Sequence, residues 1–306
     1  MFLLDKKIKI GIALLLLILT LSGCAEPKEG LVAKVYEEEI SEDQLSDEYE
    51  VFKNIYIKQF GEDAMTQKGE DGRSLEETLK EQILDKIIME KIIEKESKDM
   101  EIEVSDEEIE EKVEEYIAMT GGEDEFNEFL KGNDLTRDYF VENLRKEILV
   151  NKHKDAFIEG VEVSDKEAKD FFEANKEKLE VIRASHILLK TEEEAEKVLE
   201  RIKAGEDFEQ LAKDLSVDKA SALIGGDLGY FTKGTRIAEF EDVAFDLEQG
   251  ELSDIVKTEV GYHIIKLVDR KDEFEELEEE INMVLKENKY KEEKVRLKEE
   301  AKIKIY

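Results

Sequence analysis

The sequence predicts an α+β protein in which a small mixed domain is inserted into a mostly helical one. Residues 31–179 carry apolar side chains at helical spacing and repeated capping signatures, residues 180–270 collect glycines and strand-like runs, and residues 271–306 return to charged helix. A single C-terminal helix cannot bury its apolar stripe alone. We therefore expect residues 271–306 to pack back on the N-terminal helices, which makes residues 180–270 the insertion.

Composition limits the functions that the 306 residues can have. The formal net charge is -35, from 81 acidic and 46 basic side chains, and this field opposes binding to nucleic acid and passive adsorption onto anionic lipid. Hydrophobic residues make up 41% of the chain, which is enough for folded cores, and the length suggests two or three domains. The one cysteine excludes an internal disulfide and a cysteine-rich zinc site.

The N-terminus has the pattern of a secretory signal. Three lysines among the first nine residues precede an apolar run over residues 10–21, which is shorter than the roughly 20 residues that a membrane-spanning helix needs. Two small residues then precede Cys24. We expect residues 1–23 to be removed as a signal peptide and residues 24–30 to form a short tether.

The segment Leu21-Ser22-Gly23-Cys24 resembles a bacterial lipobox. In a lipobox the cysteine thiol receives a diacylglyceryl group and becomes the mature N-terminus. The resemblance implies a lipoprotein anchored through Cys24 at the extracytoplasmic face of a bacterial cell membrane. The alternative is an ordinary signal peptide with a chance cysteine, but the only cysteine of the chain lies at the one position that a lipobox requires.

Residues 31–179 have the pattern of a helical bundle. Residues 32–35 favour a short strand, residues 45–60 favour a helix, and isoleucines between residues 83 and 92 share one side of another helix. Four helix starts are marked by a serine followed three residues later by glutamine or glutamate: Ser41 with Gln44, Ser74 with Glu77, Ser105 with Glu108, and Ser164 with Glu167. No residue of this segment carries a catalytic signature.

Residues 180–270 have the pattern of a small domain with an antiparallel sheet. Two of the three histidines of the chain, His186 and His263, lie in its predicted strands. A histidine in an apolar strand is most often a core residue, and without a third histidine or a cysteine nearby we expect no metal site. Strands are expected over residues 182–189, 228–231, 255–257 and 262–268, and helices over residues 191–203, 208–215 and 240–247.

Five motifs in series resemble a parvulin-type peptidyl-prolyl isomerase domain. Their order and spacing fit over the whole middle segment. Together with the lipobox and the helical flanks, they make the chain similar to the extracytoplasmic foldase lipoproteins of the PrsA type. The motifs are Arg-Ala-Ser-His-Ile-Leu at residues 183–188, Asp-Lys-Ala-Ser at residues 218–221, Gly-Gly-Asp-Leu-Gly-Tyr-Phe at residues 225–231, Phe-Glu-Asp-Val-Ala-Phe at residues 240–245 and Val-Gly-Tyr-His-Ile-Ile at residues 260–265.

The resemblance implies a fold and an activity. The fold is a four-stranded antiparallel sheet with helices, and the activity is cis-trans isomerisation of X–Pro bonds, which assists secreted proteins in folding after translocation. No cofactor is implied, and the expected partners are unfolded or newly translocated polypeptides, with a homodimer left open. The alternative is a holdase chaperone whose parvulin domain is weakly active or inactive. A solute-binding lipoprotein has little support, because the sequence shows no ligand-specific polar constellation.

The resemblance also assigns catalytic candidates. His186 and His263 take the places of a hydrogen-bonded pair under the active site. Asp218 matches the acidic or thiol position beside the twisting amide, and Thr258 joins the same hydrogen-bond network. We expect the histidines to hold geometry and not to attack the substrate. For Asp218, an ordinary turn residue is the alternative.

The substrate-binding candidates surround a proline pocket. Leu228, Phe231 and Phe240 match positions that line this pocket in the family. Arg236 stands where the pocket usually has an apolar residue, often methionine. Its guanidinium can point outward, narrow the pocket or favour an acidic residue near the proline. The loop at residues 190–194 is acidic, so we expect no dependence on substrate phosphorylation.

Overall fold

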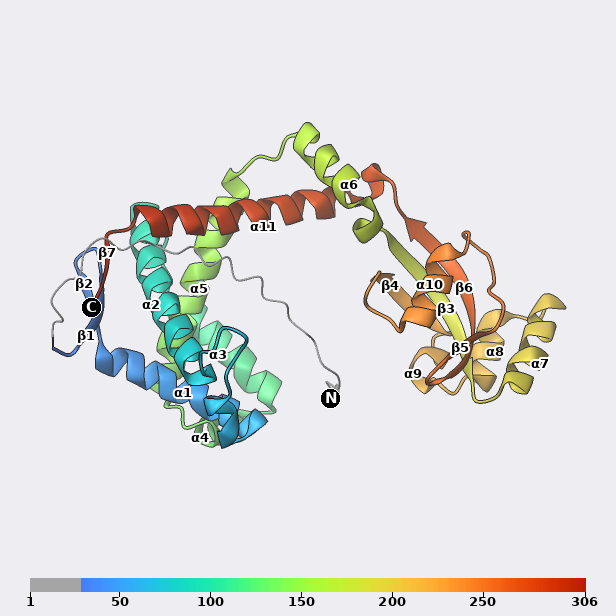
Figure 1. The fold of residues 1–306 in the computed structure, drawn as a ribbon, viewed down its shortest axis with the longest axis horizontal. Helices are drawn as coiled ribbons and strands as arrows, with labels where there is room; N and C mark the ends of the chain where they lie inside the picture. Colours follow the sequence, from blue (N-terminus) through green and yellow to red (C-terminus); the bar gives the residue numbers. More distant parts are fainter. Residues whose placement is uncertain (1–28) are drawn as a thin grey trace. The chain divides into compact units, whose positions relative to one another are not determined.

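The computed structural model describes residues 29–306, and its contacts divide this part of the chain into two compact units. One unit holds residues up to Ala156 together with Glu293–Tyr306, and the other holds Phe157–Glu292. Figure 1 labels the elements of both units. The signal segment and Cys24 lie outside the described residues, so the predicted lipidation stays a prediction. No helix between residues 29 and 306 is long and apolar enough to cross a membrane.

The first unit is built mainly from helices. The serine caps that were predicted from the sequence are confirmed, since the side chains of Ser41, Ser74 and Ser105 each accept a hydrogen bond from the backbone N–H three residues later. Isoleucines on one side of α2 are buried in the larger core cluster of this unit, together with residues of β1, β2 and α1. The helices are α1 (Glu42–Phe60), the short 3-10 helix η1 (Glu62–Thr66), α2 (Leu75–Asp99), α3 (Asp106–Thr120), α4 (Glu123–Gly132) and α5 (Arg137–Gly160).

A three-stranded antiparallel sheet joins the two segments of the first unit. Its order is β2 (Glu38–Ser41), β1 (Leu31–Val35) and β7 (Ile303–Ile305). Only the strand at β1 was predicted, because β2 and β7 are too short to show a periodic pattern. The pairing of β7 with β1 explains why the last residues of the chain belong to the same unit as the first described ones.

The C-terminal helix α11 (Phe274–Glu300) is divided between the two units. Its first half, from Phe274 to Leu285, buries its apolar side chains against α6 (Asp165–Leu179) in the second unit. Its last turns contribute Leu297 to the core of the first unit. An amphipathic helix of 27 residues is long enough to meet two different cores.

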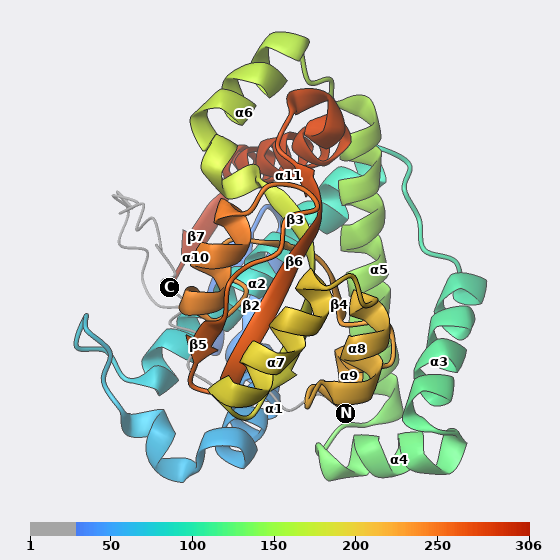
Figure 2. The same ribbon diagram turned by 90° about the vertical axis from the view of Figure 1, so that its right-hand side faces the viewer.

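The second unit contains the predicted four-stranded antiparallel sheet. All neighbouring strands pair antiparallel in the order β4-β3-β6-β5, which confirms the α+β fold. Side chains alternate between the two faces of β3 and β6. One face packs on α10 and the other on α7 and α8, as Figure 2 shows. The elements are β3 (Val181–Leu189), α7 (Glu192–Lys203), α8 (Phe208–Leu215), α9 (Lys219–Ala222), β4 (Asp227–Thr232), α10 (Ala238–Asp246), β5 (Val256–Thr258) and β6 (Gly261–Lys271).

Candidate active site

Strand alternation brings His186 and His263 to the same face of the sheet. His186 lies in β3 two residues after Ala184, and His263 lies in β6 two residues before Ile265; both apolar neighbours pack under α10. The register pairs His186 with Ile265, so the two histidines are diagonal neighbours. Their Nδ1 atoms are 3.1 Å apart, and both side chains are buried.

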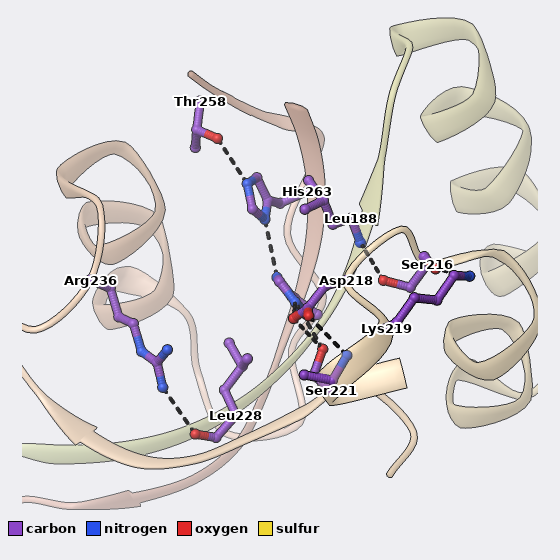
Figure 3. Close-up of polar contacts among 11 residues, drawn as sticks. Leu188, Ser216, Asp218, Lys219, Ser221, Leu228, Arg236, Thr258 and His263 are labelled. Atoms are coloured by element: carbon purple, nitrogen blue, oxygen red, sulfur yellow. Dashed lines mark hydrogen bonds and ion pairs between the residues drawn. The ribbon is translucent and has the colours of Figure 1, made fainter. Parts of the chain in front are cut away.

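The histidine pair is the centre of a longer polar chain. His186 Nε2 lies 2.9 Å from Asp218 Oδ2 and 3.1 Å from Ser221 Oγ. At the other end, His263 Nε2 lies 2.9 Å from Thr258 Oγ1. Figure 3 shows this chain running from Thr258 to Asp218. The structure therefore brings together all four residues predicted as catalytic, while their catalytic role stays a prediction.

Ser221 also belongs to the polar chain, although it was not among the predicted catalytic residues. Its hydroxyl donates a 2.6 Å hydrogen bond to Asp218 Oδ2 and also faces His186. Asp218 is the N-cap of α9, and its Oδ1 accepts the N–H of Ala220 at 3.2 Å. The Asp-x-x-Ser spacing places both side chains on the first turn of this short helix, which was the available sequence signal.

The hydrogen bonds determine which ring nitrogens carry protons. Asp218 as a carboxylate only accepts, so His186 Nε2 donates to it. His186 Nδ1 then accepts from His263 Nδ1, and His263 Nε2 accepts from the hydroxyl of Thr258. Both imidazoles are neutral in this arrangement. Each hydrogen bond of the polar chain, from Thr258 to His263, His186 and Asp218, is donated in the direction of the Asp218 carboxylate.

The local electrostatics agree with this protonation. Burial, and then the neighbouring His186, lower the pKa of His263 to about 4. Burial lowers the pKa of His186 despite its hydrogen bond with Asp218. For Asp218, burial opposes ionisation, but the hydrogen bonds from Ser221 and His186 outweigh it and lower the pKa. At neutral pH the polar chain thus carries one negative charge, on Asp218, and two neutral rings.

A glycine pair lets the chain turn close to the histidine strand. Gly226 has a φ of +85°, and its carbonyl accepts a 2.8 Å hydrogen bond from the N–H of His186. A Cβ at this position would lie 2.3 Å from the carbonyl oxygen of His186. Only glycine fits this combination of left-handed backbone and close approach. The turn thereby holds the end of α9, with Ser221, against β3.

An apolar wall stands next to the polar chain. The ring of Phe240 in α10 contacts His186 and His263 edge-on, with centroids 5.8 and 5.4 Å apart. Phe231 in β4 lies 6.3 Å from Phe240, and Leu228 packs against the same cluster. The predicted pocket residues are therefore gathered beside the predicted catalytic ones.

Arg236 is an exposed residue whose guanidinium lies along this wall. Its Nη2 donates a 3.0 Å hydrogen bond to the carbonyl of Leu228, which Figure 3 shows, and its guanidinium carbon is 5.1 Å from the centre of the Phe231 ring. Both contacts are with predicted pocket residues. The guanidinium is thus part of the wall surface, as a cation stacked on an aromatic ring.

Exposed apolar side chains flank both ends of the polar chain. Leu223 and Ile224, which are 81% and 64% exposed, lie two and three residues after Ser221, and Val260, which is 53% exposed, lies two residues after Thr258. No sequence pattern distinguishes them, since isolated surface apolar residues are common. Within residues 29–306, no group of three or more histidine, cysteine or acidic side chains is placed to hold a metal ion.

Comparison with known proteins identifies the family of this chain. A model of the PPIC-type PPIase domain matches residues 171–271, which include the polar chain and the apolar wall, and a model of the SurA-like N-terminal domain matches residues 5–154. The foldase protein PrsA of Clostridium botulinum (strain Loch Maree / Type A3) is 34% identical over 330 residues, covering 98% of this chain and 97% of that protein. The chain belongs to the PrsA foldase family. It contains a parvulin-type peptidyl-prolyl isomerase domain, as the motifs predicted.

Other PrsA proteins match over different lengths. The PrsA of Caldanaerobacter subterraneus subsp. tengcongensis is 34% identical over 85% of this chain and 82% of that protein. The PrsA of Halalkalibacterium halodurans is 48% identical, but the match spans only 42% of this chain and 38% of that protein. Among solved structures, PrsA from Bacillus subtilis is 29% identical, with 89% of this chain and 91% of that chain covered and a TM-score of 0.34.

Proposed function

We propose that this protein is a membrane-anchored extracytoplasmic foldase that catalyses cis-trans isomerisation of X–Pro bonds in unfolded, newly translocated polypeptides. The observation that carries the proposal is the polar chain from Thr258 through His263 and His186 to Asp218, lying directly against the wall of Leu228, Phe231 and Phe240. An apolar surface beside a few fixed polar groups is what this reaction requires.

The chemistry follows from the resonance of the amide. Rotation about a peptide bond faces a barrier of ~18–20 kcal/mol because the C–N bond has partial double-bond character. That resonance form places negative charge on the carbonyl oxygen. An apolar wall that removes water from the carbonyl, with the charge of Asp218 nearby, disfavours the charge-separated form and so lowers the barrier. The step needs neither a covalent intermediate nor a cofactor.

The histidines act by holding Asp218 in place. His186 Nε2–H and the hydroxyl of Ser221 both donate to Asp218 Oδ2, and His263 donates to His186 Nδ1 and so holds that ring in place. Phe240 contacts both rings and also faces the pocket. One rigid network therefore positions the anion relative to the proline, and preorganised charge costs no reorganisation during the reaction.

The test is prolyl isomerisation by the full chain with an Ala-X-Pro peptide series. Asp218→Ala and Phe240→Ala should abolish most of the acceleration while circular dichroism shows an intact fold. A matched surface variant, Asp214→Ala in α8, should behave like the wild type. If the folded wild type accelerates no peptide, the isomerase proposal fails.

A holdase is the second candidate, and one contact favours it. The guanidinium of Arg236 lies over the Phe231 ring and donates a hydrogen bond to the carbonyl of Leu228, so it covers part of the apolar wall. A holdase would suppress aggregation of an unfolded client without accelerating any X–Pro bond. An aggregation assay with the same variants separates the two, since Asp218→Ala would leave a pure holdase unchanged.

The anchor rests on the lipobox resemblance around Cys24. We propose that the thiol is lipidated and that the protein lies at the extracytoplasmic face of a bacterial membrane. Incorporation of labelled palmitate into the wild type, lost in Cys24→Ser, would support this. Wild-type protein that stays unlabelled and partitions into the soluble fraction would contradict it.

A further inference from the structure

The loop that carries Arg236 is held by a single carboxylate. Glu241 in α10 accepts hydrogen bonds from three consecutive backbone N–H groups, those of Gly234 at 2.6 Å, Thr235 at 3.2 Å and Arg236 at 3.2 Å. Successive N–H groups that converge on one anion form a rigid turn. The backbone of Arg236 is therefore fixed beside the apolar wall, and only its side chain is free to choose partners.

The present partners of the Arg236 side chain are weak ones for a guanidinium. They are the neutral carbonyl of Leu228 at 3.0 Å and the face of the Phe231 ring at 5.1 Å. In the described part of the chain, no carboxylate forms an ion pair with this guanidinium, although acidic side chains outnumber basic ones. Most of the donors of this guanidinium therefore stay available to a ligand.

The same contacts place Arg236 on the apolar surface where the proline ring of a substrate would pack. The guanidinium lies over Phe231, which together with Phe240 and Leu228 forms the surface on which a proline ring would pack. A neutral substrate has to displace it and offers no better partner in return. A substrate carboxylate does offer one, because it carries the opposite charge and can accept two parallel hydrogen bonds from the guanidinium, whereas the Leu228 carbonyl accepts only one.

We propose that Arg236 makes the site selective for prolines with an acidic residue immediately next to them. The carboxylate of that residue exchanges with the Leu228 carbonyl as the partner of the guanidinium, and the exchange uncovers the Phe231 face for the proline ring. The inference rests on the proposed isomerase function, since it names the substrate class of the same site. In this proposal, Arg236 obstructs the binding of neutral substrates and permits the binding of anionic ones.

The net charge of the chain sets the conditions of the test. A field of net charge -35 repels any acidic peptide at low ionic strength. At about 0.15 M salt the screening length is about 8 Å, so distant carboxylates contribute little while the contact with Arg236 remains. The preference for acidic peptides should therefore be measured at physiological salt.

The experiment compares peptides Ala-X-Pro-Z with glutamate, glutamine or lysine in turn at X and at Z. Affinity is measured by titration of the full chain followed by NMR, and turnover by exchange spectroscopy on the same samples. We expect glutamate next to the proline, at one of the two positions, to bind about tenfold tighter than glutamine, which corresponds to about 1.4 kcal/mol. The position that shows the effect identifies the side of the proline that Arg236 faces.

Three variants test the assignment. Arg236→Met should reduce the glutamate-to-glutamine ratio to about one and improve binding of the glutamine peptide, whereas Arg236→Lys should keep a reduced ratio. The matched control is Arg201→Met in α7, on the other face of the sheet, which should leave the ratio unchanged. Circular dichroism confirms the fold of each variant.

The outcomes separate the two proposals. A wild type that isomerises all peptides without preference overturns the role of Arg236 and leaves the isomerase function standing. A wild type that shows the binding preference but no turnover overturns the isomerase function and keeps the role of Arg236. A preference that persists in Arg236→Met, or the absence of binding to every peptide, overturns the assignment.

Discussion

His186 and His263 face each other through the same atom, Nδ1, at 3.1 Å. Two identical nitrogens at this distance require one ring to donate and the other to accept. The carboxylate of Asp218 decides which one, because it leaves His186 Nε2 only the role of donor. The charge at one end of the network therefore sets the tautomers of both rings, and Thr258 closes the other end.

The first prediction concerns the charge of Asp218. Asp218→Asn keeps the size of the side chain but removes the anion and allows its amide to donate toward His186. We expect the isomerisation rate to fall about 10- to 100-fold, since a hydrogen bond to a charged group contributes about 1.5–3 kcal/mol. Exchange spectroscopy on an X–Pro peptide measures the rate. Asp214→Asn, at an exposed site in α8, is the control, and equal rates for both variants would contradict a role for the charge.

The second prediction concerns stability below neutral pH. The pKa of His263 is lowered from 6.5 to about 4, so the unfolded chain binds a proton in this range that the folded one excludes. The contribution of His263 is complete above pH 6.5 and is lost as the pH falls toward 4, with a total on the order of 3 kcal/mol.

His263→Asn removes this titration and keeps a donor near the Nδ1 position. Urea unfolding of the two proteins between pH 7 and pH 4 gives the difference in their free energies of unfolding. We expect the wild type to lose stability more steeply over this range. Parallel curves for wild type and variant would show that His263 does not carry the effect.

The third prediction uses two glycines with similar backbone angles. Gly226→Ala places a methyl group 2.3 Å from the carbonyl oxygen of His186, so the turn or the strand must move, and we expect a loss of about 3 kcal/mol or more in the free energy of unfolding. Gly205, at the end of α7, has a φ of +96° and open space around it. Gly205→Ala should cost only about 1 kcal/mol, the strain of a left-handed alanine. Denaturant unfolding that reports on the second unit measures the free energy of unfolding of both variants. Similar losses in the two variants would refute the argument from the close approach of Gly226 to His186.

The fourth prediction concerns a buried carboxylate in the first unit. Glu48 in α1 is 3% exposed and lies 2.9 Å from the ammonium of Lys86 and 3.7 Å from that of Lys146. Glu48→Ala leaves two partly buried lysines with one fewer carboxylate. We expect a loss of about 2 kcal/mol, less than the 3–5 kcal/mol of a fully buried pair because the lysines reach solvent.

The matched control for Glu48 is Glu50 on the same helix. It pairs with Lys53 at 2.9 Å, but its side chain is about half exposed. Glu50→Ala should change the free energy of unfolding by less than about 0.5 kcal/mol. Thermal unfolding of both variants tests the comparison, and a Glu48→Ala protein as stable as Glu50→Ala would contradict a structural role for the buried cluster.

Local features were predictable from the sequence because their physics is local. The helix starts at Ser41, Ser74, Ser105 and Ser164 depend on a side chain and an N–H three residues apart, and each cap forms as predicted. The strands that carry His186 and His263 follow from runs of apolar, strand-like residues. Strand β7 was missed, since three residues after a helix have no pattern and pair only with a strand at the other end of the chain.

The identity of the site residues was predicted more completely than their contacts. The resemblance assigned His186, Asp218, Thr258 and His263, but not Ser221, whose contact with His186 depends on the position of α9 against β3. The orientation of Arg236 was left open among three alternatives. The structure adds its contacts with the carbonyl of Leu228 and the ring of Phe231, which no sequence spacing encodes, and the effect of Arg236 on substrates stays a proposal.

The sequence by itself determined the helical and mixed segments, the family and the residues that could do chemistry. These depend on periodicity, capping and motif order, which are properties of neighbouring residues. Only the tertiary structure decided that the C-terminal helix serves two cores, that two histidines meet through Nδ1, and that a guanidinium lies on the pocket wall. Such contacts join residues far apart in the chain, and they exist only once strand register and sheet packing bring those residues together.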